Sequence, residues 1–262
     1  MISIVKIMKT MILIVAYNAE KTIKQLLIRI PNDVWKTAKE IIVADDCSKD
    51  KTYQIALDYK KEYKRNNLRI VKHKVNKGYG GNQKWGYNYA IEKKYDVVVM
   101  IHGDAQYPPE FIPAMLDCIK KEKADFVFGS RMAGHPLKGG MPIYKFIGNK
   151  FLTALENLVL GTNLSEFHSG FRGYSVKALN EIPFNLNSDD FHFDSEIIIQ
   201  LVIAKKKISE ITIPTFYGKE KCHVNVIRYG LNILKILSQF LLNKYDIKKY
   251  EKFNIASHNS KA

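Results

Sequence analysis

The feature that most constrains the fold is a fivefold alternation of short apolar runs with segments of helical periodicity. The apolar runs are rich in β-branched residues, which is typical of strands buried on both faces of a sheet. Such an alternation predicts an α/β fold, in which a mostly parallel sheet with right-handed crossovers is flanked by helices. The predicted strands are 11–18, 40–44, 68–72, 97–101 and 124–129.

Carboxylates gather where two of these strands end. Asp45 and Asp46 follow the second strand, and the repulsion between these adjacent carboxylates has to be offset by another interaction. The fourth strand runs into His102-Gly103-Asp104-Ala105-Gln106. Ligands of open α/β sheets bind at the carboxyl ends of the strands, so these side chains are expected at one site. Asp104 and Gln106 alternate onto one side and offer hard oxygen ligands for Mg²⁺ or Mn²⁺, although an acidic turn without a ligand is an equal alternative from these residues alone.

The remaining strand ends carry glycines, an amide and an arginine. After the third strand, the loop 76–82 contains three glycines, which allow the backbone to approach a diphosphate; a ligand-free turn is nearly as good an explanation. The fifth strand ends in Ser130-Arg131. Asn18 after the first strand and Ser48 after the second are expected to cap the helices that follow.

The pattern changes beyond Arg131. Residues 132–142 form a loop with glycines and prolines that could order over a ligand. Amphipathic helices are expected near 143–160 and at 227–242, and a strand at 208–213. Asp194 and Glu196 open another helix, where acidic residues are favoured for dipole reasons alone. They are candidates for a general base, which is needed only if the acceptor is a sugar hydroxyl.

Composition limits the partners. The formal net charge of +15 indicates a polyanionic partner such as nucleic acid, an anionic membrane surface or a phosphorylated substrate, although solvated helix faces explain most of the lysines. The three cysteines lack metal-ligand spacing and indicate a reduced protein. Neither a signal-peptide layout nor an apolar run of about 20 residues is present, so a cytoplasmic protein without a transmembrane helix is expected.

The order of the strand-end motifs resembles family 2 glycosyltransferases of the GT-A fold, and most of all their dolichyl-phosphate mannose synthase-like branch. The match covers about residues 10 to 225. It implies a Rossmann-like catalytic domain over 1–225, followed by a C-terminal amphipathic helix and basic tail over 226–262. The motifs are Ala16-Tyr17-Asn18, Asp45-Asp46-Cys47-Ser48-Lys49-Asp50, Asn76-Lys77-Gly78, Gly103-Asp104-Ala105-Gln106-Tyr107-Pro108-Pro109, Gly129-Ser130-Arg131 and Ser169-Gly170-Phe171-Arg172.

By this resemblance, the N-terminal half binds a nucleotide-sugar, and Asp104 with Gln106 holds a divalent metal on its diphosphate. The family commonly carries Asp-x-Asp-x-Gln here, whereas this chain has His102 at the first aspartate position. The loss of one carboxylate changes metal affinity, although a neutral imidazole can still bind Mn²⁺. The residues implied in donor binding are Ala16, Tyr17, Asn18, Asp45, Asp46, Lys77, Gly78, Asp104, Arg131 and Arg172.

Individual roles follow from the chemistry of these groups. Asp45 or Asp46 would accept the imide N–H of uracil or the N–H groups of guanine. Arg131 and the metal would neutralise the charge that builds on the departing nucleoside diphosphate. For Arg172, contact with phosphate is favoured over a structural ion pair. The predicted catalytic residues are Asp104, Arg131, Asp194 and Glu196, and the residues expected to meet an anionic acceptor are Lys219, Lys221, His223 and Arg228.

The predicted activity is metal-dependent transfer of a sugar from a UDP- or GDP-sugar to a polyprenyl phosphate or a surface glycan, with inversion. One rival is a sugar-nucleotide nucleotidyltransferase, whose glycine-rich basic loop is absent after the first strand, where residues 16–20 stand instead. A second is a non-catalytic polyanion-binding protein, but no nucleic-acid recognition motif supports it, and strand-end carboxylates would repel phosphates.

The segment 227–242 has two interpretations. Its apolar residues gather on one side of a helix, and basic residues lie beside them and in the tail from Asn243, which is expected to be frayed. The basic flank favours peripheral contact with the inner face of the cell membrane. Packing on the domain, or on a second subunit in a homodimer, is as good an explanation of the apolar stripe.

Overall fold

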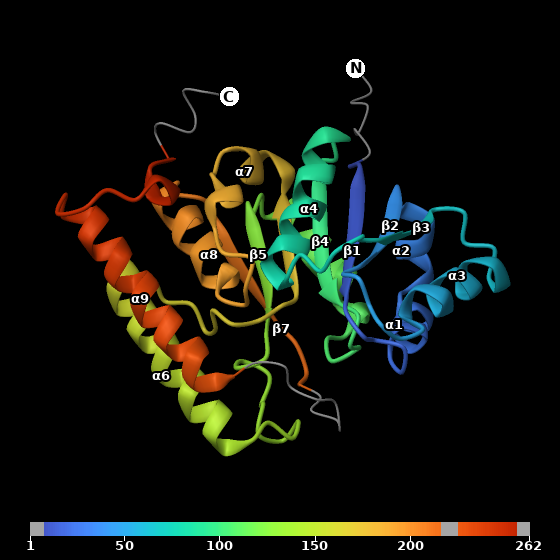
Figure 1. The fold of residues 1–262 in the computed structure, drawn as a ribbon, viewed down its shortest axis with the longest axis horizontal. Coiled ribbons are helices and arrows are strands. Elements are labelled where there is room, and N and C mark those ends of the chain that lie inside the picture. Colours follow the sequence, from blue (N-terminus) through green and yellow to red (C-terminus); the bar gives the residue numbers. More distant parts are fainter. Residues whose placement is uncertain (1–7, 216–224, 256–262) are drawn as a thin grey trace.

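The computed structural model describes residues 8–215 and 225–255, and in this part of the chain one seven-stranded sheet carries helices on both faces (Figure 1). The strand order is β3-β2-β1-β4-β6-β5-β7. Strand β1 (Thr10–Ala16) pairs in parallel with both β2 (Glu40–Asp45) and β4 (Val97–His102), and β2 pairs in parallel with β3 (Leu68–Lys72). These pairings confirm the predicted mostly parallel α/β sheet.

The other half of the sheet contains a strand that the sequence did not predict. Strand β6 (Arg172–Ser175) lies between β4 and β5 (Phe126–Ser130) and is antiparallel to both, while β7 (Ile208–Thr212) is parallel to β5. The four residues of β6 include Gly173, so no alternation of apolar side chains marks them. A side chain at Gly173 would begin 2.9 Å from Cγ1 of Val127, which explains why the strand has a glycine here.

Two apolar cores lie on opposite faces of the sheet because side chains alternate along each strand. Ile12 and Ile14 of β1 point into the first core, and Met11 and Leu13 point into the second. The helices that contribute to the first core are α1 (Ile23–Arg29), α2 (Asn32–Thr37), α3 (Thr52–Glu62) and α5 (Ile112–Lys121), the last preceded by η1 (Pro109–Phe111). Those of the second core are α4 (Tyr79–Glu92), α7 (Val176–Asn180) and α8 (Phe193–Ile203), with η2 (Phe184–Leu186).

Two long helices, α6 (Ile143–Leu160) and α9 (Val226–Lys244), lie side by side beyond α8 (Figure 1). One face of α9 is buried against α6 and α8 through Ile233, Ile236, Leu237 and Phe240. The chain then continues into η3 (Glu251–Phe253), whose Phe253 is buried in the same cluster. The expectation of a frayed tail from Asn243 is therefore wrong for residues up to 255. Among the described helices, none is long and apolar enough to cross a membrane.

The start of α4 is packed tightly against the segment that leads into α8. The N–H of Gly80 donates to the carbonyl of Asp189 at 2.7 Å. A Cβ at Gly80 would lie 2.4 Å from the carbonyl oxygen of Ser188 and 2.8 Å from Cβ of Phe193. Only a residue without a side chain allows this contact between α4 and the 188–193 segment, and this contact forms one wall of the site described below.

We expect Gly80→Ala to lower the free energy of unfolding by about 1–3 kcal/mol, because the backbone atoms it meets cannot rotate away. Gly148→Ala on α6 is the matched control, since nothing lies within 4 Å of its new Cβ. The control is expected to keep or raise stability, by up to about 1 kcal/mol from helix propensity. Urea unfolding followed by circular dichroism measures both, and equal stabilities would contradict the predicted clash.

Candidate active site

A cavity of about 1630 Å³ opens at the carboxyl ends of β1 and β4. The chain order reverses between these two strands, which is where open α/β sheets bind their ligands. From this edge the cavity extends across the start of α8 to the helices α6 and α9. Its lining includes ten of the predicted site residues, namely Ala16, Tyr17, Asn18, Asp46, Gly78, Asp104, Gln106, Arg131, Asp194 and Glu196. The predicted residues that do not line it are Asp45, Lys77 and Arg172.

The turns after β1 and β2 are tied to one another. The hydroxyl of Ser48 accepts from the N–H of Asn18 at 2.9 Å, and the amide oxygen of Asn18 accepts from the N–H of Lys49 at 3.0 Å. Neither residue caps a helix as predicted, because α1 begins only at Ile23 and α3 only at Thr52. The two side chains instead hold neighbouring strand ends together at the mouth of the cavity.

The adjacent carboxylates Asp45 and Asp46 have different surroundings. Asp45 is fully buried, accepts from the N–H of Ser48 at 3.0 Å and lies 4.0 Å from Nζ of Lys72. Asp46 lines the cavity and accepts from the N–H of Lys77 at 2.7 Å. Burial raises the pKa of Asp46, an effect that the Lys77 N–H partly offsets. Only Asp46 is therefore placed to meet a ligand, while Asp45 stabilises its own turn.

Asp104 and Gln106 share one turn after β4. Between them, Ala105 adopts a left-handed conformation with φ of 60°, and Oδ1 of Asp104 accepts from the N–H of Gln106 at 3.1 Å. The Asp104 side chain is 40% exposed, so its carboxylate is accessible from the cavity. The described residues contain no group of three or more His, Cys, Asp or Glu arranged to hold a metal. The donor set fits a hard ion that also takes ligands from phosphate and water, as Mg²⁺ commonly does.

His102 ends β4 beside this turn. Its Nε2 lies 2.8 Å from the hydroxyl of Tyr79, and its Nδ1 lies 3.9 Å from Oδ2 of Asp104. Burial lowers the pKa of His102, although the carboxylates of Asp104 and Asp194 act against this. The imidazole is therefore neutral at pH 7. Burial and the neighbouring Asp194 raise the pKa of Tyr79 well above its ordinary value, so this hydroxyl keeps its proton.

The sequence interpretation of Arg172 as a phosphate contact needs correction. Its side chain is only 1% exposed, and its guanidinium lies 3.5 Å from Oδ2 of Asp194. It also donates to the carbonyls of Ser169, Phe167 and Asp194 at 2.6, 2.8 and 3.0 Å. Arg172 thus forms a structural ion pair with Asp194 behind the cavity wall, which is the alternative that the sequence left open.

The two general-base candidates are also engaged within the wall. Asp194 accepts from the Tyr79 hydroxyl at 2.8 Å and from Nε2 of Gln83 at 3.2 Å, one partner for each oxygen. Glu196 accepts from Nζ of Lys252 and from the N–H of Ser188, both at 2.7 Å. Since all four oxygens are occupied and both side chains are buried, the structure favours a structural role over general-base catalysis.

Glu166 is a site residue that the sequence analysis missed. It is fully buried, and its carboxylate accepts from the backbone N–H of Arg131 at 2.9 Å and from Nε of Arg131 at 3.0 Å. This pair holds the guanidinium at the wall of the cavity, where Arg131 also donates to the carbonyl of His168. Burial raises the pKa of Glu166, but Arg131 outweighs burial, and the pKa lies below its ordinary value. No local pattern marks Glu166 in the sequence.

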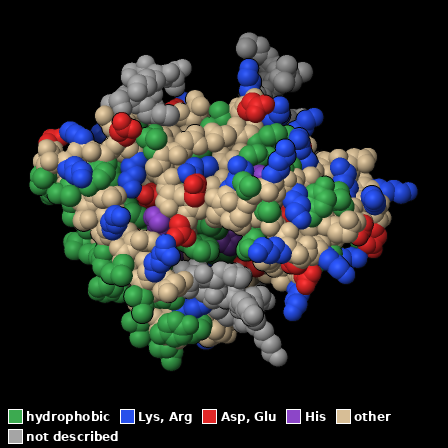
Figure 2. Space-filling model, viewed as in Figure 1, with side chains coloured by type: hydrophobic (Ala, Val, Ile, Leu, Met, Phe, Trp, Pro, Cys, Tyr) green, Lys and Arg blue, Asp and Glu red, His purple; other side chains and the backbone are tan. Residues whose placement is uncertain are grey.

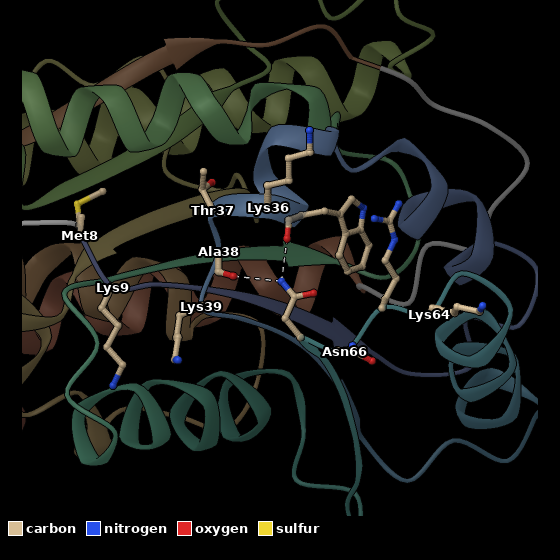
Figure 3. A pocket seen from close by; sticks show the side chains of 11 residues that line it. Met8, Lys9, Lys36, Thr37, Ala38, Lys39, Lys64 and Asn66 are labelled. Atoms are coloured by element: carbon tan, nitrogen blue, oxygen red, sulfur yellow. Dashed lines mark hydrogen bonds between the residues drawn. The ribbon is translucent and has the colours of Figure 1, made fainter.

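Three basic residues of the two long helices also line the cavity, and we call them the basic rim: Lys145 of α6, and Arg228 and Lys235 of α9. Of the four residues expected to meet an anionic acceptor, only Arg228 can be placed; Lys219, Lys221 and His223 lie outside the described residues. A smaller cavity of about 530 Å³ lies at the opposite edge of the sheet, beside Lys39 (Figure 3). Four lysines line it: Lys9 and Lys39 point to one side, Lys36 points to the opposite side and Lys64 points away from all three, and no strand-end carboxylate is among the lining residues.

Comparison with known proteins identifies the family. The sequence profile described as "Glycosyl transferase family 2" matches residues 11–183. The chain belongs to this family. Within it, the glycosyltransferase falls in the dolichyl-phosphate mannose synthase-like branch, as its resemblance implied.

Two relatives and one solved structure illustrate the likeness. The glycosyltransferase is 32% identical over 216 residues to the UDP-N-acetylglucosamine–dolichyl-phosphate N-acetylglucosaminyltransferase of Methanococcus voltae, covering 79% of this chain and 85% of the relative. It is 26% identical over 241 residues to the undecaprenyl-phosphate mannosyltransferase of Micrococcus luteus, covering 86% and 95%. Glucosyl-3-phosphoglycerate synthase from Mycobacterium tuberculosis, solved with Mn²⁺, UDP and glucosyl-3-phosphoglycerate, superposes with a TM-score of 0.66 at 18% identity, covering 88% of this chain and 79% of that one. This likeness shows the GT-A fold.

We expect Glu166→Gln to lower the free energy of unfolding at pH 7 by about 3 kcal/mol, because it breaks a buried ion pair. Since the pKa of Glu166 is lowered in the folded state, this stabilisation is present above the ordinary carboxyl range and is lost as the pH falls through the folded pKa. The difference between wild type and variant should therefore shrink in acid. Urea unfolding from pH 7 down to pH 3 measures it.

Glu110→Gln is the matched control. Glu110 also pairs with an arginine, Arg29, at 2.8 Å, but its side chain is 46% exposed. An exposed pair contributes about 0–1 kcal/mol, so the control should differ little from wild type at pH 7. A loss in Glu166→Gln no larger than in the control, or one independent of pH, would contradict a structural role of the Arg131–Glu166 pair.

Proposed function

We propose that this glycosyltransferase moves a sugar from a UDP- or GDP-sugar to a polyprenyl phosphate, with a divalent metal and with inversion at the anomeric carbon. One observation carries the proposal: a single cavity joins the acidic strand ends of β2 and β4 to the basic rim between α6 and α9. A donor and an anionic acceptor can therefore occupy its two ends. The acceptor class is supported by two relatives whose names specify dolichyl phosphate and undecaprenyl phosphate.

The donor is assigned to the strand ends. Asp46 is placed to accept N–H groups of the base, and Gly78 and the turn of Asn18 lie beside it in the cavity wall. Asp104 and Gln106 would hold Mg²⁺ or Mn²⁺ against the diphosphate; a solved GT-A relative that contains Mn²⁺ and UDP supports this. The ion would stabilise negative charge on the departing nucleoside diphosphate. Arg131, oriented by Glu166, adds a fixed positive charge at the same wall.

The acceptor is assigned to the basic rim. Lys145, Arg228 and Lys235 would attract the phosphate and orient one oxygen toward the anomeric carbon, from the side opposite the leaving diphosphate. Attack from that side inverts the configuration. A lipid phosphate is already ionised at pH 7 and gives up no proton, so the reaction needs no general base. This agrees with Asp194 and Glu196, whose oxygens are all engaged.

The outer surface beside the rim is apolar. Figure 2 shows hydrophobic side chains gathered on the side of the molecule that α6 and α9 form. On α6 the exposed residues recur at spacings that place them on one helix face. We call this set the apolar arm surface; it consists of Ile143, Tyr144, Ile147, Phe151 and Leu158 of α6 and Ile227, Leu231 and Leu234 of α9. We propose that it contacts an anionic membrane surface, where a polyprenyl phosphate is met, because basic residues flank it.

The donor and metal assignments are tested by thermal shift with UDP, GDP and their sugars, with and without Mn²⁺. We expect either the uridine or the guanosine nucleotides to raise the melting temperature. Mn²⁺ should increase this rise in wild type but not in Asp104→Asn, which keeps the shape of the side chain but removes its charge. Transfer to a short polyprenyl phosphate, followed by mass spectrometry, should be lost in the same variant. Asp117→Asn on α5, whose carboxylate is exposed and paired with Lys121, is the control. Metal-stimulated transfer by Asp104→Asn at the control's rate would refute the metal site.

The membrane assignment predicts that Ile147→Glu combined with Leu231→Glu abolishes flotation with anionic liposomes, because two charges would enter the lipid interface. The control is Ile28→Glu, an exposed isoleucine of α1 outside the arm, which should float like wild type. Analytical sedimentation of each variant measures its oligomeric state, and so tests the alternative that a second copy of the chain covers the apolar arm surface. Unchanged flotation of the double variant would contradict membrane contact. So would a wild-type protein that does not float but is a dimer, if the double variant is a monomer.

A further inference from the structure

The hydroxyl of Tyr79 has one proton and two partners. Its oxygen lies 2.8 Å from Oδ2 of Asp194 and 2.8 Å from Nε2 of His102. A carboxylate only accepts hydrogen bonds, and Asp194 accepts from the Tyr79 hydroxyl while it is paired with Arg172. The Tyr79 proton therefore lies toward Asp194, and the hydroxyl oxygen accepts from His102. An imidazole that binds a metal is neutral, and with Nε2 donating to Tyr79 its ring proton lies on Nε2 and its lone pair on Nδ1.

This lone pair belongs to a ring that its neighbours hold in place. The rings of Tyr79 and Tyr107 both meet the imidazole of His102 edge-on, with centroids 5.2 Å away. A Cβ at Gly170 would lie 2.2 Å from Cε1 and Nε2, so only glycine leaves room for the imidazole. Nδ1 then faces Oδ2 of Asp104 at 3.9 Å. Two atoms that only accept are brought together favourably by a cation between them.

We propose that His102 is a nitrogen ligand of the divalent metal, and that Tyr79 and Asp194 position it through the ring proton. The proposal rests on the metal-dependent transfer proposed above. The 3.9 Å between Nδ1 and Oδ2 is about 1 Å longer than the separation of adjacent ligands of an octahedral ion, about 3 Å at bond lengths of about 2.1 Å, and a rotation of the 40% exposed Asp104 side chain would close the difference. Ligating histidines are commonly oriented by a hydrogen bond from the second ring nitrogen, directly or through intermediates, to a carboxylate.

The choice of metal follows from the ligand. Mg²⁺ favours oxygen ligands, whereas imidazole nitrogen adds more to the binding of a transition ion. His102 in place of a carboxylate should therefore shift the preference from Mg²⁺ toward Mn²⁺. His102→Asp, which offers an all-oxygen set, should shift it back. Tyr79→Phe keeps the ring but removes the acceptor that sets the tautomer, so it should weaken Mn²⁺ binding about tenfold.

The test is electron spin echo spectroscopy of Mn²⁺ bound with UDP, using protein with ¹⁴N- or ¹⁵N-labelled histidine. We expect a nitrogen coupling that changes with the label, disappears in His102→Asp and persists in His192→Asn. His192 is the matched control because it lines the same cavity. Calorimetry with Mn²⁺ and Mg²⁺ in the presence of UDP measures the change in preference for His102→Asp and Tyr79→Phe, and circular dichroism confirms that each variant is folded.

The outcomes separate this inference from the function on which it rests. Mn²⁺ bound with UDP but without a histidine nitrogen coupling would overturn the His102 assignment and leave metal-dependent transfer standing. If the coupling is lost in His192→Asn instead, the nitrogen ligand is His192, and the assignment of His102 is overturned as well. If wild type binds no Mn²⁺ with or without UDP, the metal site itself fails, and the proposed metal dependence falls with it.

Discussion

The buried ion pair between Arg172 and Asp194 is the interaction on which the rest of the site depends. It joins the short antiparallel strand β6 to the start of α8, and Asp194 extends the connection to Tyr79 on α4. Removing one partner of such a pair costs about 3–5 kcal/mol, because an uncompensated charge stays buried. The guanidinium is also satisfied by backbone carbonyls, among them those of Phe167 and Ser169. The network thus joins β6, α8 and α4 to β4, where it ends at His102, beside the turn that carries Asp104.

Charges in the wall of the cavity are mostly compensated before any ligand binds. Glu166 is paired with Arg131 and Glu196 with Lys252, and Asp45 is hydrogen-bonded within its turn. Asp46 and Asp104 are the strand-end carboxylates that face the cavity. This arrangement reconciles a net charge of +15 with carboxylates at the proposed donor end, because basic residues line the other part of the cavity, where we propose that the anionic acceptor binds.

Local sequence patterns could predict the strands and the edge at which they end. Runs such as 97–101 are apolar because both faces of their sheet are covered, and that signal needs no knowledge of partners. Strand β6 escaped prediction because its four residues, Arg172 to Ser175, contain no run or alternation of apolar side chains. The role of Arg172 was misjudged because phosphate contact and a structural ion pair require the same residue type, and its partner Asp194 is not close to it in the sequence. Tyr79 was within reach, since Gly78 and Gly80 flank it, whereas nothing local distinguished Glu166.

Local sequence patterns were enough for the α/β class and for the gathering of Asp45, Asp46, Asp104 and Gln106 at one edge, because these depend on periodicity and on residues close together in the chain. The family was indicated by the resemblance in the order of the strand-end motifs. Packing of distant segments set which lining carboxylates are paired, as Asp194 is with Arg172 and Glu196 with Lys252, and it combined the apolar faces of α6 and α9 into one surface. It also brought His102 within hydrogen-bonding distance of Tyr79, the contact from which the tautomer of His102 is inferred. A proton goes to whichever acceptor lies within reach, and Tyr79, His102 and Asp194 meet only when distant segments pack.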